Sequence, residues 1–191
     1  MSHKAQQTFC FSIQKKYPHL FSGKEILDVG SMDINGNNRI FFPDPASYIG
    51  LDIGPGNNVD VICPIHQYDP QKQFDVVIST ECFEHDVNWK ESIRRIYDLT
   101  KDNGMILLTI AGKHRPEHGT TRTSPSDSPY TTEYYRNITA ADLLSLFELE
   151  DEFVIWELSY DRLSCDIRFF GLKKQKEAEV EFNPDGYPSA I

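Results

Sequence analysis

The sequence predicts an α/β fold in which a doubly wound, mostly parallel sheet carries helices on both faces. Two observations predict it. Short apolar runs bounded by glycine, proline or asparagine recur along the chain, as is typical of buried strands. Helical periodicity fills the stretch between two of these runs, at 87–104, so that strand and helix signals alternate. With 191 residues, 39% of them hydrophobic, the chain can bury the core of one domain.

Buried strands are expected first in the N-terminal part of the chain. They occupy 25–30, 47–53, 59–62, 74–80 and 105–112. Two more strand-like stretches follow at about 150–158 and 165–173, with no helix between them. Because parallel neighbours need a long crossover, these two are expected to form an antiparallel hairpin at one edge of the sheet.

Helices are predicted from periodicity and from capping residues. An N-terminal helix at about 3–17 is expected to cover the sheet. The stretch 87–104 has its apolar residues at helical spacing with charged residues between them, which indicates an amphipathic helix. Thr139 and Asp142 match a capping box, which predicts a helix that continues through about Phe147.

We expect one domain over 1–174, followed by a flexible tail at 175–191. The segment 112–138 is long, polar and rich in glycine, serine, threonine and proline. A loop of this length in a compact domain is usually functional, often as a lid or a binding loop. We therefore expect 112–138 to close over a ligand site.

Composition and charge argue against several classes of function. The formal net charge of −10 disfavours a nucleic-acid substrate, since phosphate binding relies on basic surfaces. No apolar run approaches the roughly 20 residues of a membrane span, and the N-terminus has no secretory signal, so we expect a cytoplasmic protein. The four cysteines have wide, irregular spacings that fit neither a zinc site nor a disulfide framework, so no metal is expected. Nothing in the sequence specifies an oligomeric state.

The loop after the first predicted strand is the strongest candidate for a ligand site. In doubly wound sheets, ligands bind at the carboxyl ends of the strands. Gly30 lets the backbone approach a ligand closely there, and Gly36 suits the turn that follows. Asp52 ends the second strand about twenty residues later, where a carboxylate accepts hydrogen bonds from ribose hydroxyls. Together these residues predict a nucleoside cofactor.

Four segments together resemble class I S-adenosylmethionine-dependent methyltransferases of the methyltransferase-11 type. ILDVGS resembles the first motif of that family, YIGLDI the second, FDVVISTECFEH the fourth-strand motif, and DLTKDNGMILLTIAG the motif at the fifth strand. The resemblance covers about 22–112. It implies a Rossmann-like sheet of seven strands in the order 3-2-1-4-5-7-6, with the last strand antiparallel. It also implies S-adenosyl-L-methionine as cofactor and S-adenosyl-L-homocysteine as product.

The resemblance also implies a set of cofactor-binding residues. These residues are Asp28, Gly30, Ser31, Met32, Gly36, Asp52, Ile53, Cys63, Ile65 and Thr80. Two positions depart from the family pattern. Met32 takes the place of the loop's second glycine, and Pro64 stands where an acid commonly contacts the adenine amino group. Adenine is therefore expected to be held by the backbone of 63–66 and by Ile53.

Methyl transfer is an in-line displacement, so catalysis depends mainly on holding the acceptor atom close and in line. A base helps when the acceptor is a hydroxyl or a protonated amine. The candidate bases are Glu81, His85 and His114. Glu81 has an alternative role in binding the cofactor's ammonium group, and His85 in packing beneath its methionine end. The candidate substrate-binding residues are Arg115, His118, Arg122, Tyr134 and Tyr135.

The predicted reaction is methylation of an oxygen or nitrogen atom of a small molecule or a glycan. The motif of DNA amino-methylating enzymes is missing after the fourth strand, where the chain reads STEC at 79–82. Two alternatives stay open. An NAD-dependent oxidoreductase also combines a glycine loop with an acid at this spacing. A methyltransferase-like domain without activity would act as a binding or scaffold module.

Overall fold

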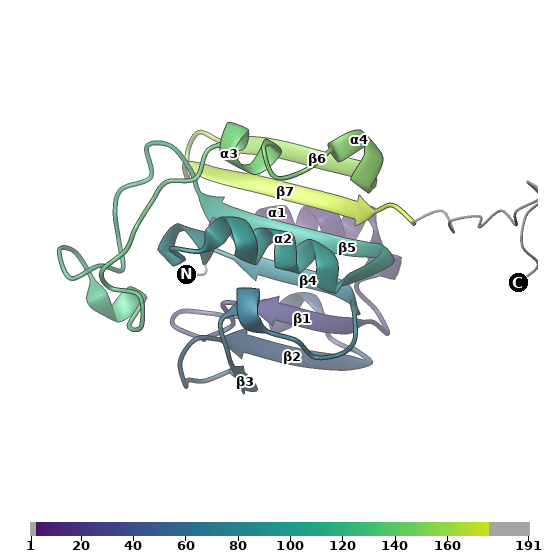
Figure 1. The fold of residues 1–191 in the computed structure, drawn as a ribbon, viewed down its shortest axis with the longest axis horizontal. Coiled ribbons are helices and arrows are strands. Elements are labelled where there is room, and N and C mark those ends of the chain that lie inside the picture. The colour runs from purple at the N-terminus through teal and green to yellow at the C-terminus, as the bar shows by residue number, and fades with distance from the viewer. Residues whose placement is uncertain (1–2, 176–191) are drawn as a thin grey trace, which may run out of the picture.

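The computed structural model describes residues 3–175, which contain one seven-stranded sheet (Figure 1). The strands are β1 (Glu25–Val29), β2 (Ser47–Asp52), β3 (Val61–Ile62), β4 (Phe74–Thr80), β5 (Thr100–Ala111), β6 (Phe153–Asp161) and β7 (Asp166–Lys173). Their order is β3-β2-β1-β4-β5-β7-β6. β7 is antiparallel to both of its neighbours, and the other pairs are parallel. This topology confirms the fold class and the strand order expected from the sequence.

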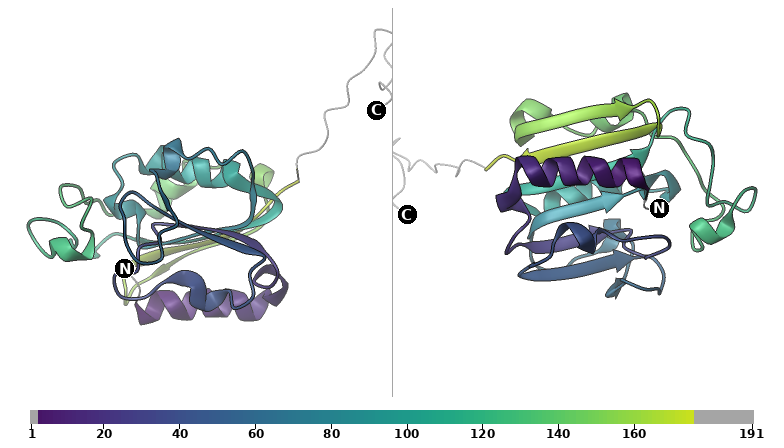
Figure 2. Two further views of the ribbon diagram at one scale, coloured as in Figure 1. Left: turned by 90° about the horizontal axis from the view of Figure 1, so that it is seen from below. Right: turned by 180° about the vertical axis from the view of Figure 1, so that it is seen from behind.

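Helices cover both faces of the sheet. Figure 2 shows α1 (Lys4–Lys16) on one face and α2 (Trp89–Leu99) on the other. The short helices α3 (Ala140–Leu144) and α4 (Leu149–Glu152) contact β6. The other helical elements of residues 3–175 are short 3-10 helices: η1 (Pro18–Leu20), η2 (Asn38–Phe41), η3 (Ile65–Gln67), η4 (Phe83–His85) and η5 (Pro125–Asp127).

The side-chain alternation of the strands divides the core into two layers. In β1, Ile26 belongs to the apolar cluster beneath α1, and the next residue, Leu27, belongs to the cluster beneath α2. To the second cluster α2 contributes Trp89, Ile93, Ile96, Tyr97 and Leu99. By the same alternation, Asp28 faces the α1 layer and Val29 faces the α2 layer. The end of β1 can therefore present different chemistry on its two sides.

One boundary differs from the sequence prediction. β5 starts at Thr100, directly after α2, where the predicted helix extended to 104. The link from β1 to β2 contains the short helix η2. Asn38 in η2 is buried and donates a hydrogen bond to Asp28 (Nδ2 to Oδ1, 2.7 Å). This contact holds the short link against β1.

The C-terminal part of the sheet follows the prediction, except at the helix ends. Thr139 and Asp142 form the predicted capping box, with a hydrogen bond in each direction. The helix α3 ends before Phe147, because Phe147 turns into the core and stacks on Phe169 with the ring centroids 6.0 Å apart. The helix α4 then displaces the start of β6 to Phe153.

The long segment 112–138 connects β5 to α3 and contains η5 as its regular structure (Figure 1). It lies at the end of the sheet where the parallel strands finish. The predicted tail at 175–191 lies, apart from its first residue, outside the described part of the chain. Within 3–175, none of the helices combines the length and the apolar character that crossing a membrane requires.

Replacing Thr139 with alanine should destabilise the domain by about 1 kcal/mol, the usual cost of losing an N-cap hydroxyl. The Thr139 side chain accepts a hydrogen bond from the backbone N–H of Asp142 at 3.1 Å. Thr139→Ser keeps this hydroxyl and should keep most of the stability. Urea unfolding of the two variants measures the difference, and equal losses would argue against the capping role.

Candidate active site

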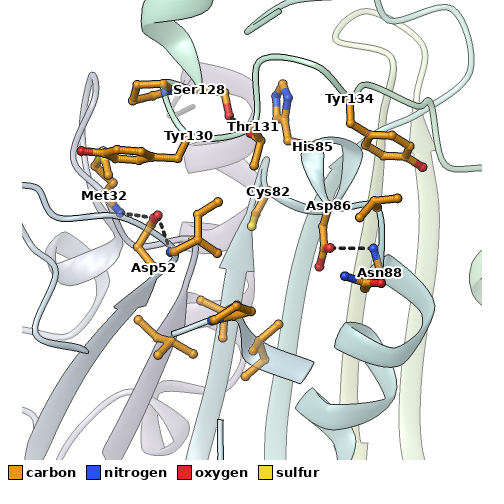
Figure 3. Close-up of a pocket in the computed structure, with 18 of the residues that line it drawn as sticks. Met32, Asp52, Cys82, His85, Asp86, Asn88, Ser128, Tyr130, Thr131 and Tyr134 are labelled. Atoms are coloured by element: carbon orange, nitrogen blue, oxygen red, sulfur yellow. Dashed lines mark hydrogen bonds between the residues drawn. The ribbon is translucent and has the colours of Figure 1, made fainter. Parts of the chain in front are cut away.

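A cavity of about 490 Å³ opens at the carboxyl ends of β1, β2 and β4 (Figure 3). Its apolar lining includes Val29, Leu51 and Ile65. Residues 127–134 of the long segment between β5 and α3 form another part of its wall. Cavities of this volume commonly bind small molecules and cofactors. The cavity therefore lies where the loop after the first strand predicted a ligand site.

The turn after β1 brings two strand ends into contact. Gly30 has a φ of +72°, in the left-handed region that favours glycine, and its N–H donates to the carbonyl of Leu51 at 2.9 Å. A Cβ at this position would lie 2.5 Å from Sγ of Cys82 and 2.7 Å from its Cβ. The backbone at the end of β1 thus approaches the end of β4 as closely as a glycine allows.

Asp52, at the end of β2, holds the same turn from its other side. Its carboxylate accepts hydrogen bonds from the backbone N–H groups of Met32 (3.0 Å) and Ile53 (2.8 Å) (Figure 3). Burial raises the pKa of the Asp52 carboxyl, against the opposing effect of these backbone donors. Asp52 also lines the cavity, and a carboxylate has about four acceptor positions. It can therefore accept further hydrogen bonds from a ligand hydroxyl.

A second cavity, of about 20 Å³, lies on the other side of the turn after β1. Asp28 is fully buried there and accepts hydrogen bonds from Asn38 and from the hydroxyl of Tyr48, both at 2.7 Å. Burial raises the pKa of Asp28 to about 6 despite these bonds. Thr80 donates to Oδ1 of Asn38 at 3.1 Å. This network shapes the loop between β1 and η2.

The structure divides the predicted cofactor-binding residues between the two cavities. The larger cavity is lined by Gly30, Met32, Asp52, Ile53, Cys63 and Ile65, and also by Pro64 and His66. The smaller cavity is lined by Asp28, Gly30, Ser31, Met32, Gly36 and Thr80, together with Asn37 and Asn38. All ten predicted residues therefore border one cavity or the other, and the two cavities share Gly30 and Met32.

Tyr130 covers part of the larger cavity from the segment 112–138. Its ring lies over Gly54, where an added Cβ would come within 2.2 Å of two ring carbons. Its hydroxyl donates to the carbonyl of Pro55 at 3.0 Å. In Figure 3, Tyr130 lies beside Met32 at the mouth of the cavity. The segment 112–138 thus has the placement that a lid requires.

His85 borders the larger cavity just beyond β4 and packs against two residues of the segment 112–138. Its ring centroid lies 5.1 Å from that of His118 and 5.4 Å from that of Tyr135, both edge-on. Burial, aided by nearby His118, lowers the pKa of His85 to about 4, so this imidazole is neutral at pH 7. Glu84 is fully buried, and its burial, together with the charge of Glu81, raises its pKa to about 8.

Glu81 belongs to a buried ion network that the sequence did not predict. Its carboxylate lies 3.7 Å from Nε2 of His3 and 4.0 Å from the guanidinium of Arg115. Asp166 lies 3.0 Å from Nε2 of His3 and accepts a hydrogen bond from Arg115 at 3.2 Å. Hydrogen bonding to Asp166, and then to Glu81, raises the pKa of His3 to about 9. The network ties the start of α1 to the ends of β4 and β5 and the start of β7.

The predicted catalytic and substrate-binding residues are only partly brought together. Those that line the larger cavity are Glu81, His85 and Tyr134. Those that do not line it are His114, Arg115, His118, Arg122 and Tyr135. His114 and Arg122 are exposed, and Arg122 forms an ion pair on the surface. His118 and Tyr135 pack against the ring of His85.

Sequence reasoning missed three titratable residues at this end of the sheet: His3, Glu84 and Asp166. The sequence offered a motif that could have identified Glu84, because this residue is the first of the Glu-His pair in the fourth-strand motif. His3 and Asp166 lie near opposite ends of the chain, and only the packing of α1 on the sheet brings them together. No local pattern could have paired them.

Comparison with family models matches residues 1–151 to a family described as a methyltransferase domain. The matched residues include most of the lining of both cavities and the whole segment 112–138. The methyltransferase-11 type, to which the motifs were compared, stays a prediction. Among curated proteins, none matches this chain.

Solved structures with the same fold include methyltransferases from several bacteria. The 1,6-didemethyltoxoflavin-N1-methyltransferase of Burkholderia thailandensis, with bound S-adenosylhomocysteine, is 15% identical, with a TM-score of 0.60 over 90% of this chain and 79% of that chain. An S-adenosylmethionine-dependent methyltransferase of Clostridium acetobutylicum is 9% identical, with a TM-score of 0.63 over 89% and 92%. The N-methyltransferase NodS of Bradyrhizobium japonicum, in complex with S-adenosylhomocysteine, is 8% identical, with a TM-score of 0.55 over 86% and 87%. At these identities, the likeness concerns the fold.

Gly30→Ala should destabilise the domain more than Gly23→Ala. Both glycines have positive φ angles, +72° and +63°, but an added Cβ at Gly23 meets nothing within 4 Å. Both variants therefore carry backbone strain of roughly 1–2 kcal/mol. Only Gly30→Ala adds overlap with Cys82, at a further cost of about 1–3 kcal/mol. Urea unfolding measures the free energy of unfolding of both variants. Equal losses of stability in the two variants would contradict the close approach of β1 and β4.

The buried ion network predicts that His3 stabilises the domain below about pH 6.5 and loses this effect as the pH rises through about 9. The sign follows because the folded chain holds the His3 proton more tightly than the unfolded chain. The comparison is with His3→Asn, because asparagine can still cap α1. The stability difference between wild type and variant should shrink by on the order of 1–3 kcal/mol between pH 6 and about pH 10. Urea unfolding across this range tests it, and a constant difference would count against the network.

Proposed function

Because the chain belongs to the methyltransferase-domain family, we propose that it transfers the methyl group of S-adenosyl-L-methionine to an oxygen or nitrogen atom of a small molecule or a glycan. One observation carries the proposal. The Gly30 turn and the Asp52 carboxylate meet at one cavity, at the carboxyl ends of parallel strands. Nucleoside cofactors of doubly wound folds bind at this position.

The groups around the cavity suit the parts of this cofactor. Asp52 has acceptor positions for ribose hydroxyls, and Gly30 has no side chain to keep a ligand away from the backbone. Ile53 and Ile65 offer apolar surface for adenine. When bound, the cofactor supplies a methyl group on a sulfonium, which makes that methyl an electrophile. S-adenosyl-L-homocysteine is the product of the transfer.

The acceptor is proposed to bind near His85 and Tyr134, which line the cavity together. Figure 3 shows both of them away from Asp52, across the cavity. With a pKa of about 4, His85 is neutral at pH 7 and is a weak base. Its proposed role is therefore to orient the acceptor, and most of the rate enhancement comes from proximity and alignment. The catalytic role of exposed His114 stays a prediction.

The names of structural relatives support a small-molecule acceptor without choosing its reacting atom. The Burkholderia thailandensis and Bradyrhizobium japonicum enzymes are named for transfer to nitrogen, and the relative CurJ is named a carbon methyltransferase. The methyltransferase family match favours methyl transfer over the NAD-dependent alternative. A cytoplasmic location and the absence of a nucleic-acid substrate stay predictions.

Asp52→Ala should weaken the binding of S-adenosyl-L-homocysteine by about 10- to 100-fold, the loss expected when hydroxyls lose a charged hydrogen-bond partner. Calorimetric titration measures the affinity. Asp44→Ala is the matched control, because this exposed carboxylate accepts from Ser22 and does not line the cavity. Equal affinity of wild type and Asp52→Ala for S-adenosyl-L-homocysteine would contradict the proposed cofactor site.

Turnover separates an enzyme from an inactive module. The chain is incubated with S-adenosyl-L-methionine and pooled metabolites and sugars, and release of S-adenosyl-L-homocysteine is measured. The proposal expects release that depends on the pool. Cofactor binding without release in any pool would favour the binding or scaffold alternative.

A further inference from the structure

Two buried side chains and one partly buried side chain converge beside the larger cavity, in an arrangement that the proposed methyl transfer does not explain. Glu84 and His85 belong to η4, directly after β4, and His118 belongs to the segment 112–138. One ligand atom from each, a carboxylate oxygen or a ring nitrogen, lies within 4.8 Å of the other two. His118 Nε2 is 3.8 Å from Oε1 of Glu84.

Four polar atoms of this cluster lack a hydrogen-bond partner, whereas Nδ1 of His118 lies 3.1 Å from the carbonyl oxygen of Pro116. Both carboxylate oxygens of Glu84, Nδ1 of His85 and Nε2 of His118 are buried without a hydrogen-bond partner. Glu84 is fully buried, and His85 is 7% exposed. Buried polar groups in folded proteins are nearly always hydrogen-bonded, because an unsatisfied one costs about 1–3 kcal/mol. Unsatisfied atoms on three side chains whose ligand atoms lie this close together therefore point to a missing common partner.

The neighbouring network of His3, Glu81 and Asp166 differs from this cluster, because its carboxylates already have cationic partners. There, the Arg115 guanidinium and the protonated His3 ring already supply positive charge to both carboxylates. Within residues 3–175, the ion-pair partner of Glu84 is His118, and no lysine or arginine pairs with it. Of the two clusters, the Glu84 cluster is thus the one without a lysine or arginine partner among the described residues.

We propose that Glu84, His85 and His118 bind one divalent transition-metal ion, with zinc as the best match. Two imidazole nitrogens and one carboxylate oxygen are a common ligand set for Zn²⁺, and three protein ligands leave one coordination position open. The expectation of no metal came from cysteine spacings, and this cluster contains no cysteine. The site shares His85 with the acceptor site proposed above, but Zn²⁺ binding can be measured without methyl transfer, so the two proposals can fail separately.

The geometry requires an adjustment of the side chains. In a tetrahedral site, two ligand atoms that are each about 2.0–2.1 Å from zinc lie about 3.4 Å apart. The present separations are all within 4.8 Å, and the His118–Glu84 separation is already 3.8 Å, so side-chain rotations can close the site. Gly119 already packs against the His85 ring, where an added Cβ would lie 2.7 Å from Cε1, and the N–H of Arg136 donates to the carbonyl of Glu84 at 2.8 Å.

A metal here would fasten the segment 112–138 to the end of β4. Two ligands come from the sheet side and one from the segment, so the ion would cross-link the two parts of the cavity wall. Because an ion that binds the folded state alone stabilises it, zinc should raise the melting temperature.

The test is a titration of the full chain, stripped with a chelator, with Zn²⁺ alone. Calorimetry should find one tight site per chain, and the melting temperature should rise on binding. Glu84→Gln and His118→Ala should each weaken Zn²⁺ binding by at least about tenfold, the loss that even changes outside the ligand shell produce. His3→Asn and His19→Ala, which alter a neighbouring histidine and a remote exposed one, should leave the affinity unchanged.

Cobalt replaces zinc as a spectroscopic probe and identifies the ligand type. Nitrogen and oxygen ligands should give visible d–d bands without thiolate-to-metal charge transfer. No tight Zn²⁺ site in the wild type, or undiminished binding in folded His118→Ala, would overturn the proposal. Charge-transfer bands would also overturn it, because they would place the ion on a thiolate such as that of nearby Cys82. Circular dichroism establishes that each variant is folded, and His118→Ala keeps the test decisive if Glu84→Gln fails to fold.

Discussion

The ends of β1 and β4 touch through Gly30 and Cys82, with no space between them for a Cβ. β1 lies between β2 and β4, so this contact fixes the position of the loop that follows β1. The N–H of Met32, two residues farther on, donates to Asp52 at the end of β2. The turn is therefore held from both sides, and the larger cavity begins directly beyond it. The shape of the site depends on a glycine at this one position.

The residues that follow β4 place two buried carboxylates only three positions apart. Glu81 has a φ of +53° and joins His3, Asp166 and Arg115, so its charge is compensated by cations of the chain. Glu84 lies among imidazoles without such a cation among the described residues, and its two buried oxygens without hydrogen-bond partners are the physical reason for invoking a metal ion. Through these groups, the start of α1 and the segment 112–138 are both anchored at the same strand end.

Periodicity predicted the strands well, because it depends on local sequence, whereas the cofactor-binding roles of the residues in the motifs stay a prediction. The strand-end motifs led to residues such as Gly30 and Asp52 that the structure brings to the cavities. The link after β1 was harder, since Asn38 is held by a buried contact with Asp28 and not by helical propensity. The segment 112–138 has no periodicity to show which side chains point inward. Exposed His114 could not be distinguished there from buried residues.

The most direct measurement of the central claim is a crystal structure of the chain grown with S-adenosyl-L-homocysteine. The nucleoside should lie in the larger cavity, with its ribose hydroxyls within hydrogen-bonding distance of Asp52 and its amino-acid tail beside Gly30. A nucleoside bound elsewhere, or an Asp52 carboxylate that keeps only its backbone partners while the ligand is present, would contradict the assignment.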